Sequence, residues 1–205
     1  MPYEGVDVNA VAEDVSVKAS STEVSLNLSL IQDEIAETAA GIDAAQLAAL
    51  AGRISDADRV FLAGAGRSGL VLRMAAMRLM HLGLTVHVAG DTTTPAIRTG
   101  DLLVVASGSG TTAGVVKAAQ TAVSAGAKVA ALTTNQHSPV AELANEVVVI
   151  PAAQKTDHGS SITRQYSGSL FEQALFLATE AVFQTLWADT DEPAEQLWLR
   201  HANLE

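Results

Sequence analysis

The sequence lacks cysteine and contains few aromatic residues. None of its 205 residues is cysteine, which excludes disulfides, thiolate metal sites and a cysteine nucleophile. Aromatic residues make up only 4% of a chain that is 48% hydrophobic, so alanine, valine, leucine and isoleucine must form most of the core. This composition is typical of helices packed on a parallel sheet whose strands are buried on both faces.

Positive charge is also scarce. Lysine and arginine number 12 against 23 aspartate and glutamate residues, which gives a formal net charge of −11 at pH 7. A nucleic-acid-binding protein needs clustered lysine and arginine, and here these residues are scattered, so no nucleic-acid partner is expected. An acidic chain still binds anions where backbone N–H groups are free at a helix N-terminus.

Long hydrophobic runs are missing as well. No stretch approaches the ~20 apolar residues that cross a bilayer, so no membrane association is expected. The first residues, Met1-Pro2-Tyr3-Glu4, have neither the basic nor the apolar region of a signal peptide. We therefore expect a cytoplasmic protein.

The chain instead alternates short β-rich runs with longer alanine-rich helical stretches. Five strands separated by helices predict βαβ units and an α/β fold with a parallel sheet and right-handed crossovers. The strands are expected at residues 60–63, 85–88, 102–106, 128–132 and 146–150. The helices are expected at residues 22–40, 43–53, 68–82, 111–125, 138–144 and 168–187, with a last helix starting near residue 191.

The domain organisation predicted from these patterns is simple. Residues 1–21 show no convincing period and are interpreted as an N-terminal tail, and residues 22–205 as one domain with N- and C-terminal helices. Residues 151–167 form a polar loop of a length that is unusual inside a compact domain and is often functional. His158 and Arg164 on this loop are candidates to close over a ligand.

Two glycine- and serine-rich loops follow predicted strands. Residues 64–69 read Gly-Ala-Gly-Arg-Ser-Gly after the first strand, and residues 107–112 read Ser-Gly-Ser-Gly-Thr-Thr after the third. A G-x-G-x-x-G loop between a strand and a helix lets the backbone approach a phosphate, and the helix N-terminus supplies free N–H donors. Either loop alone is also consistent with a tight turn. In a sheet of order 2-1-3-4-5, however, the two loops flank the crevice where ligands bind, which predicts an anionic ligand.

A dinucleotide site is the main alternative for these loops. Asp91 lies shortly after the second predicted strand, about where an acid that binds a ribose hydroxyl is expected. Against this, the loop at 107–112 is suited to a second polar anchor, and no second domain follows to receive a hydride. Asp91 also begins Asp-Thr-Thr-Thr-Pro, which reads as a loop with side-chain-to-backbone hydrogen bonds.

Together these motifs resemble the sugar isomerase (SIS) domain family, and within it the isomerases of hexulose phosphates. The resemblance runs from about residue 22 to the end of the chain. It is carried by residues 64–69, 78–83 (Arg-Leu-Met-His-Leu-Gly), 91–95, 107–112, 171–172 (Phe-Glu) and 200–204 (Arg-His-Ala-Asn-Leu). Two departures stand out: position 111 is threonine where many SIS loops carry glutamate, and residues 166–170 lack an expected proline.

The resemblance implies a flavodoxin-like five-stranded sheet, no metal or cofactor, and a homotetramer, or at least a dimer. It implies interconversion of 3-hexulose 6-phosphate and fructose 6-phosphate through an enediol, a step of formaldehyde fixation in the ribulose monophosphate pathway. By analogy with other SIS sites, the phosphate would be bound by Ser107, Ser109 and Thr112, and the substrate nearby by Gly66 and Ser68. The candidate set is completed by neighbours in the same two loops: Arg67, Gly69, Gly110 and Thr111.

Moving a carbonyl to the adjacent carbon requires a base and donors for the enediolate oxygen. Glu172 is the candidate base, although Ser169-Leu-Phe-Glu172 also reads as a capping box in which Glu172 only caps the helix. The resemblance favours catalysis by Glu172, and implies that His201 reaches the active site of a neighbouring subunit. His81 is a reserve candidate whose simpler interpretation is a charge at a helix C-terminus or an interface residue.

Other functions stay open at this point. Another isomerase of the same family would act on a different sugar phosphate, such as arabinose 5-phosphate. A non-catalytic sugar-phosphate sensor usually carries a DNA-binding domain, and only about 55 mostly acidic or neutral residues precede the predicted sheet.

Overall fold

The computed structural model describes residues 20–154, 163–166 and 168–204 as a three-layered α/β fold. Its centre is a sheet of five parallel strands in the order β2-β1-β3-β4-β5. The strands are β1 (Val60–Gly64), β2 (Val86–Val88), β3 (Leu102–Ala106), β4 (Lys128–Thr133) and β5 (Glu146–Val149). The predicted fold class, the number of strands and their order are confirmed, and the strand limits differ from the predicted ones by one residue at most.

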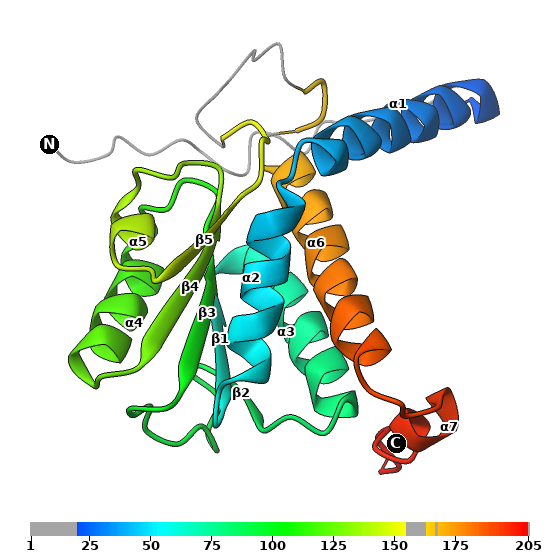
Figure 1. The fold of residues 1–205 in the computed structure, drawn as a ribbon. Coiled ribbons are helices and arrows are strands. Elements are labelled where there is room, and N and C mark those ends of the chain that lie inside the picture. The colour runs from blue at the N-terminus through cyan, green and yellow to red at the C-terminus, as the bar shows by residue number, and fades with distance from the viewer. Residues whose placement is uncertain (1–19, 155–162, 167, 205) are drawn as a thin grey trace, which may run out of the picture.

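Helices cover both faces of this sheet (Figure 1). One face carries α2 (Ala44–Ser55), α3 (Gly66–His81) and α6 (Ser169–Ala188), and the other carries α4 (Ala113–Ser124) and α5 (Pro139–Glu142). The first helix, α1 (Ser21–Ala40), contacts α6 and projects beyond the sheet. A last short helix, α7 (Ala194–Trp198), lies near the C-terminus. None of the helices in the described part of the chain is long and apolar enough to cross a membrane.

The start of each N-terminal helix follows from its sequence. Ser20 caps α1, because its side chain accepts the N–H of Glu23 while the Glu23 carboxylate accepts the N–H of Ser20. Asp43 caps α2 by accepting the N–H of Ala45. The expected tail at residues 1–21 falls almost wholly outside the described residues, and α1 begins at Ser21.

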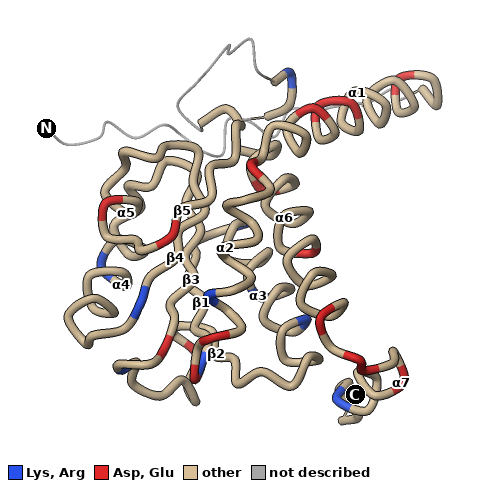
Figure 2. The backbone as a smooth tube through the Cα atoms, in the orientation of Figure 1, with Lys and Arg blue, Asp and Glu red and all other residues tan. Residues whose placement is uncertain are grey.

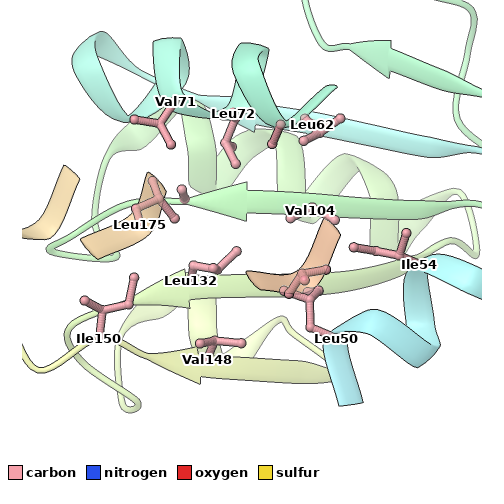
Figure 3. Packing of buried hydrophobic residues seen from close by; sticks show 14 of the residues in the cluster. Leu50, Ile54, Leu62, Val71, Leu72, Val104, Leu132, Val148, Ile150 and Leu175 are labelled. Atoms are coloured by element: carbon pink, nitrogen blue, oxygen red, sulfur yellow. The ribbon is translucent and has the colours of Figure 1, made fainter. Parts of the chain in front are cut away.

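Branched aliphatic side chains between the sheet and the α2, α3, α6 layer form the larger core cluster (Figure 3). Leu62, Val104 and Leu132 from adjacent strands face Leu72 of α3 and Leu175 of α6. All five side chains are at most 3% exposed. This packing fixes α3 and α6 against each other and sets their first turns beside the carboxyl ends of β1 and β3.

The two ends of α6 therefore lie at opposite ends of the strands. Its first turn is next to the carboxyl ends of the strands, whereas its last turn leads into α7 near the end of α3 (Figure 1). Arg200, which follows α7, donates a 2.9 Å hydrogen bond to the backbone oxygen of His81, the last residue of α3. The C-terminal segment is thus held at the edge opposite the glycine-rich loops.

Candidate functional site

A cavity of about 200 Å³, lined in part by serine and threonine, lies where β1 and β3 end. Both glycine-rich loops reach it, as the strand order predicted. It is lined by Ala65, Gly66, Ser68, Ala106, Ser107, Gly108, Ser109, Thr112 and Phe171. Five of the nine predicted binding residues in the two loops therefore line one cavity: Gly66, Ser68, Ser107, Ser109 and Thr112.

The first loop presents the N-terminus of α3 to this cavity. The N-cap residue Ala65 has no side chain that can bond the first-turn N–H groups, so the helix supplies donors. Gly66 has a positive φ of 56°, a conformation that favours glycine. Gly69 packs on the end of β1, where an added Cβ would lie 2.6 Å from the Gly64 oxygen. Gly69 thus supports the loop by close packing on Gly64, and its N–H donates to the backbone oxygen of Ala65.

The second loop is held by hydrogen bonds among its own hydroxyl groups. The hydroxyls of Ser107 and Thr112 are 3.0 Å apart, and the Gly110 N–H donates to the Ser107 hydroxyl over 3.1 Å. Thr111 donates both its N–H and its hydroxyl to Ser109. Thr112 is the N-cap of α4 but makes no side-chain cap bond, so its hydroxyl faces the loop. Gly110 and Thr111 shape this loop and do not line the cavity.

Phe171 of α6 and two threonines at the end of β4, which the sequence analysis did not single out, support the second loop. The hydroxyls of Thr133 and Thr134 both donate to the Gly108 oxygen, at 3.1 and 2.8 Å. Phe171 packs its ring on Gly108, 3.4 Å from where a Cβ would be. Only their position in the sequence could have identified the two threonines, because residues at the carboxyl end of β4 lie at the same end of the sheet as the two loops.

Gly110 sits so close to buried Ser138 that we expect Gly110→Ala to disturb the loop. Gly110 has φ 66°, and an added Cβ would lie 2.0 Å from the Ser138 hydroxyl. We expect a loss of about 1–3 kcal/mol in the free energy of unfolding, measured by urea titration, together with weaker phosphate binding. Gly114→Ala is the matched control, because nothing lies within 4 Å of its added Cβ. A fully stable Gly110→Ala variant would contradict this close fit.

Beside the cavity, Glu172 of α6 forms an ion pair with Arg67 of α3. The Glu172 side chain is 4% exposed and that of Arg67 is 67% exposed, so the arginine lies between the carboxylate and solvent. Burial of a carboxylate is tolerated when a positive partner accompanies it. Both residues line a neighbouring cavity of about 370 Å³, which adjoins the first at the starts of α3 and α6.

The capping-box interpretation of Glu172 is wrong. The N-cap of α6 is Gly168, with φ 86°, and it makes no side-chain cap bond. Ser169 is the first helical residue rather than the cap, so it does not share a box with Glu172. Because residue 168 is a glycine in the left-handed region, the helix starts one residue earlier than a serine cap would require, and Glu172 turns toward Arg67.

His201 lies far from Glu172 within one chain. Its ring stacks on Trp198, with centroids 4.5 Å apart, and its Nδ1 is 3.4 Å from Nε2 of His81. Glu172 is in the first turn of α6 and His201 follows α7, beyond the last turn. The 16 residues from Glu172 to the end of α6 span about 24 Å at 1.5 Å per residue.

Burial changes the expected role of His81. The residue is 6% exposed. Burial, helped by His201 and then Arg78, lowers the pKa of the His81 imidazole below its ordinary value. The lowered pKa favours a neutral ring at pH 7, which does not fit the interpretation of His81 as a positive charge at the end of α3.

The other candidates lie outside the cavity. Both carboxylate oxygens of Asp91 accept hydrogen bonds from Arg73, at 2.7 and 3.3 Å. Asp91 therefore forms an ion pair with α3. Arg164 is exposed, and its N–H donates to Glu34 of α1. His158 lies outside the described residues. Among the described residues, histidine, aspartate and glutamate form no group of three or more that could hold a metal.

Comparison with known proteins places this geometry in a family. Residues 53–177 match the SIS domain model. The chain is 68% identical to a 3-hexulose-6-phosphate isomerase of Mycobacterium gastri, over 96% of this chain and 98% of that protein. It is 40% identical to a 3-hexulose-6-phosphate isomerase of Bacillus subtilis, over 85% of this chain and 95% of that protein.

A crystal structure from Methanococcus jannaschii, for which a 3-hexulose-6-phosphate isomerase function was inferred, has the same fold. It superposes with a TM-score of 0.75 at 28% sequence identity, covering 88% of this chain and 99% of that one. The family model covers more than half of the chain, and the relatives match it along almost their full length. The chain belongs to the SIS domain family, in the group that contains these 3-hexulose-6-phosphate isomerases.

Proposed function

We propose that the protein interconverts 3-hexulose 6-phosphate and fructose 6-phosphate. The observation that carries the proposal is the convergence of two anion-binding loops on one cavity, with the Arg67–Glu172 pair beside it. The relatives of Mycobacterium gastri and Bacillus subtilis, which match nearly the whole chain, bear the name of this activity. The same activity was expected from the sequence motifs.

The phosphate group of the substrate is assigned to the loop at 107–112. Ser107, Ser109 and Thr112 offer hydroxyl donors, and the first turn of α4 adds N–H donors. Ser68 and the N–H groups after Gly66 face the same cavity from α3. A phosphate held here leaves the sugar carbons free to extend across the start of α3 toward Arg67 and Glu172.

The reaction moves a carbonyl from carbon 3 to carbon 2. Glu172 removes the proton from carbon 2, which gives a carbon 2–carbon 3 enediolate, and then returns a proton to carbon 3. Arg67 is placed to donate to the enediolate oxygen as negative charge develops there. A second group must move the hydroxyl proton from one oxygen to the other. His201 is assigned this role, supplied by a neighbouring subunit because it cannot reach Glu172 of its own chain.

The proposal therefore includes self-association. A homotetramer, or at least a dimer, is expected, with sites completed between subunits. Sedimentation that shows only monomers at micromolar concentration would remove His201 from the mechanism.

Removal of a phosphate-binding hydroxyl should raise KM more than it lowers kcat. For Ser107→Ala we expect KM for the sugar phosphate to rise about tenfold, because one charge-assisted hydrogen bond is lost. Thr121→Val is the control, since the Thr121 hydroxyl bonds the Lys117 oxygen on an exposed part of α4. If KM is unchanged while kcat falls, the phosphate does not bind at this loop.

A coupled assay tests the function itself. Formaldehyde and ribulose 5-phosphate, condensed to 3-hexulose 6-phosphate by a synthase, supply the substrate, and fructose 6-phosphate formation is followed. Turnover of arabinose 5-phosphate instead would assign another isomerase. Thermal stabilisation by fructose 6-phosphate without turnover would indicate a sensor, and stabilisation by NAD alone a nucleotide site.

A further inference from the structure

We infer that His81 and His201 form a binding site for a divalent transition metal ion such as Zn²⁺, with Nε2 of His81 and Nδ1 of His201 as its two protein ligands. These two residues, the histidine pair, lie where the segment after α7 meets the end of α3. The glycine-rich loops are at the opposite end of the strands. The site itself is independent of the proposed function, and only its effect on turnover rests on that function.

The separation of the two ring nitrogens matches a shared metal better than a hydrogen bond. Nδ1 of His201 is 3.4 Å from Nε2 of His81. A hydrogen bond from an N–H group is usually about 2.7–3.2 Å long, so this contact is a long one. Two imidazole nitrogens that each lie about 2.0–2.1 Å from one tetrahedral zinc are about 3.3–3.4 Å apart. The histidine pair therefore already has the nitrogen separation of a zinc site.

The two rings are held in place by contacts on different segments. His81 is the last residue of α3 and is buried. The His201 ring stacks on Trp198 with 9° between the ring planes, and the His201 N–H donates to the Trp198 backbone oxygen over 2.9 Å. Arg200 ties the two segments together through its 2.9 Å hydrogen bond to the His81 backbone oxygen. Ligands that are ordered before the metal arrives bind it more tightly, because less freedom is lost on binding.

The environment of His81 also favours the protonation state that a metal needs. Only a neutral imidazole can bind a metal ion, because a protonated ring has no free lone pair. Burial in the first place, then His201 and Arg78, lowers the pKa of the His81 imidazole below its ordinary value. The neutral ring at pH 7 therefore has a lone pair to offer.

The arginines near the histidine pair are each matched by a carboxylate. Arg78 pairs with Glu180 at 3.6 Å, and Arg200 pairs with Glu192 at 2.7 Å. Figure 2 shows acidic positions beside basic ones around α7. Because both arginines are paired, a divalent cation bound between the two rings meets no uncompensated positive charge from either of them.

Composition and ligand type narrow the class of metal. The chain has no cysteine, so no thiolate competes with the imidazoles for a transition metal. Imidazole suits zinc, copper and nickel, whereas magnesium and calcium prefer oxygen ligands. In the part of the chain that the structure describes, no third histidine, aspartate or glutamate completes the ligand set. Water must fill the remaining positions, so we expect reversible binding rather than a closed structural site.

Zinc binding measured by calorimetry tests the site. The wild-type protein should bind Zn²⁺ at micromolar concentration, and His81→Asn and His201→Ala should each weaken binding at least about tenfold. His137→Ala is the matched control, because Nε2 of His137 lies next to the Gln136 amide on an exposed turn. If His81→Asn fails to fold, His201→Ala still decides, because Arg200 keeps the C-terminal segment in place. No binding by the wild type at about 100 μM Zn²⁺, or unchanged binding by His201→Ala, would overturn the inference.

A crystal soaked with zinc tests the position of the metal directly. Diffraction data collected at the zinc absorption edge should show an anomalous peak about 2.0–2.1 Å from both ring nitrogens. A peak on one ring alone, or only at other residues, would contradict a shared site.

Metal binding should also inhibit the proposed reaction. A metal on Nδ1 of His201 leaves the ring proton on Nε2, so the ring can no longer accept a proton from a substrate oxygen. Zn²⁺ should therefore lower kcat of the wild type, EDTA should restore it, and the residual activity of His201→Ala should not respond to Zn²⁺. The binding and diffraction measurements use no sugar, so a chain that binds zinc between the two rings but has no isomerase activity would refute the proposed function and leave the metal site standing.

Discussion

Glu172→Gln is expected to lower kcat by at least about 100-fold, because loss of the base removes the proton transfer at carbon. Glutamine keeps the size of the side chain and can still accept a hydrogen bond from Arg67. Binding of fructose 6-phosphate, measured by calorimetry, should therefore change by less than about threefold, since only the transition state depends on the carboxylate. The expected result is a loss in kcat without a comparable rise in KM.

Glu180→Gln provides the control on the same helix. Glu180 pairs with Arg78 at 3.6 Å near the surface, so its replacement also removes one ion pair between α6 and α3. This variant should keep wild-type kcat, because surface ion pairs contribute at most about 1 kcal/mol to stability. Equal losses in both variants would point to helix packing rather than catalysis. Undiminished turnover by Glu172→Gln would remove this residue as the base.

The fold was predictable because the strands can be recognised from short segments of the sequence. The runs that became β1, β3 and β4 are buried on both faces, so they read as unbroken aliphatic segments between helical stretches. Parallel pairing and right-handed crossovers then leave few possible strand orders. The position of both glycine-rich loops at one edge followed from that order, without any knowledge of side-chain contacts.

The details of the site depend on contacts between distant segments. Arg67 and Glu172 are 105 positions apart in the sequence, and their pairing is set by how α3 packs on α6. The start of α6 was predicted to within one residue, but its N-cap was not. A serine three residues before a glutamate fits a capping box, whereas the chain enters the helix through Gly168. The contact of His81 with His201 likewise required the docking of α7 against the end of α3.

His201→Ala is expected to lower kcat about 100-fold, if the imidazole moves the proton between substrate oxygens. The variant should remain folded, because the C-terminal segment keeps other contacts. Arg200 still pairs with Glu192 at 2.7 Å and bonds the His81 oxygen, and Trp187 still donates to the Glu192 oxygen. Steady-state kinetics and the sedimentation mass should be measured together. A variant that loses mass along with activity would show that His201 supports assembly instead.

Mixing two inactive variants decides whether His201 acts between subunits. In a hybrid of Glu172→Gln and His201→Ala chains, the first chain supplies His201 and the second supplies Glu172, so one site is intact wherever the two meet. With two-fold contacts and random exchange, about a quarter of all sites regain both groups, and about a quarter of wild-type activity should return. Because α6 separates the two residues within one chain, no such recovery is possible unless subunits share sites. If the exchanged mixture regains no activity, His201 of one subunit does not act with Glu172 of another.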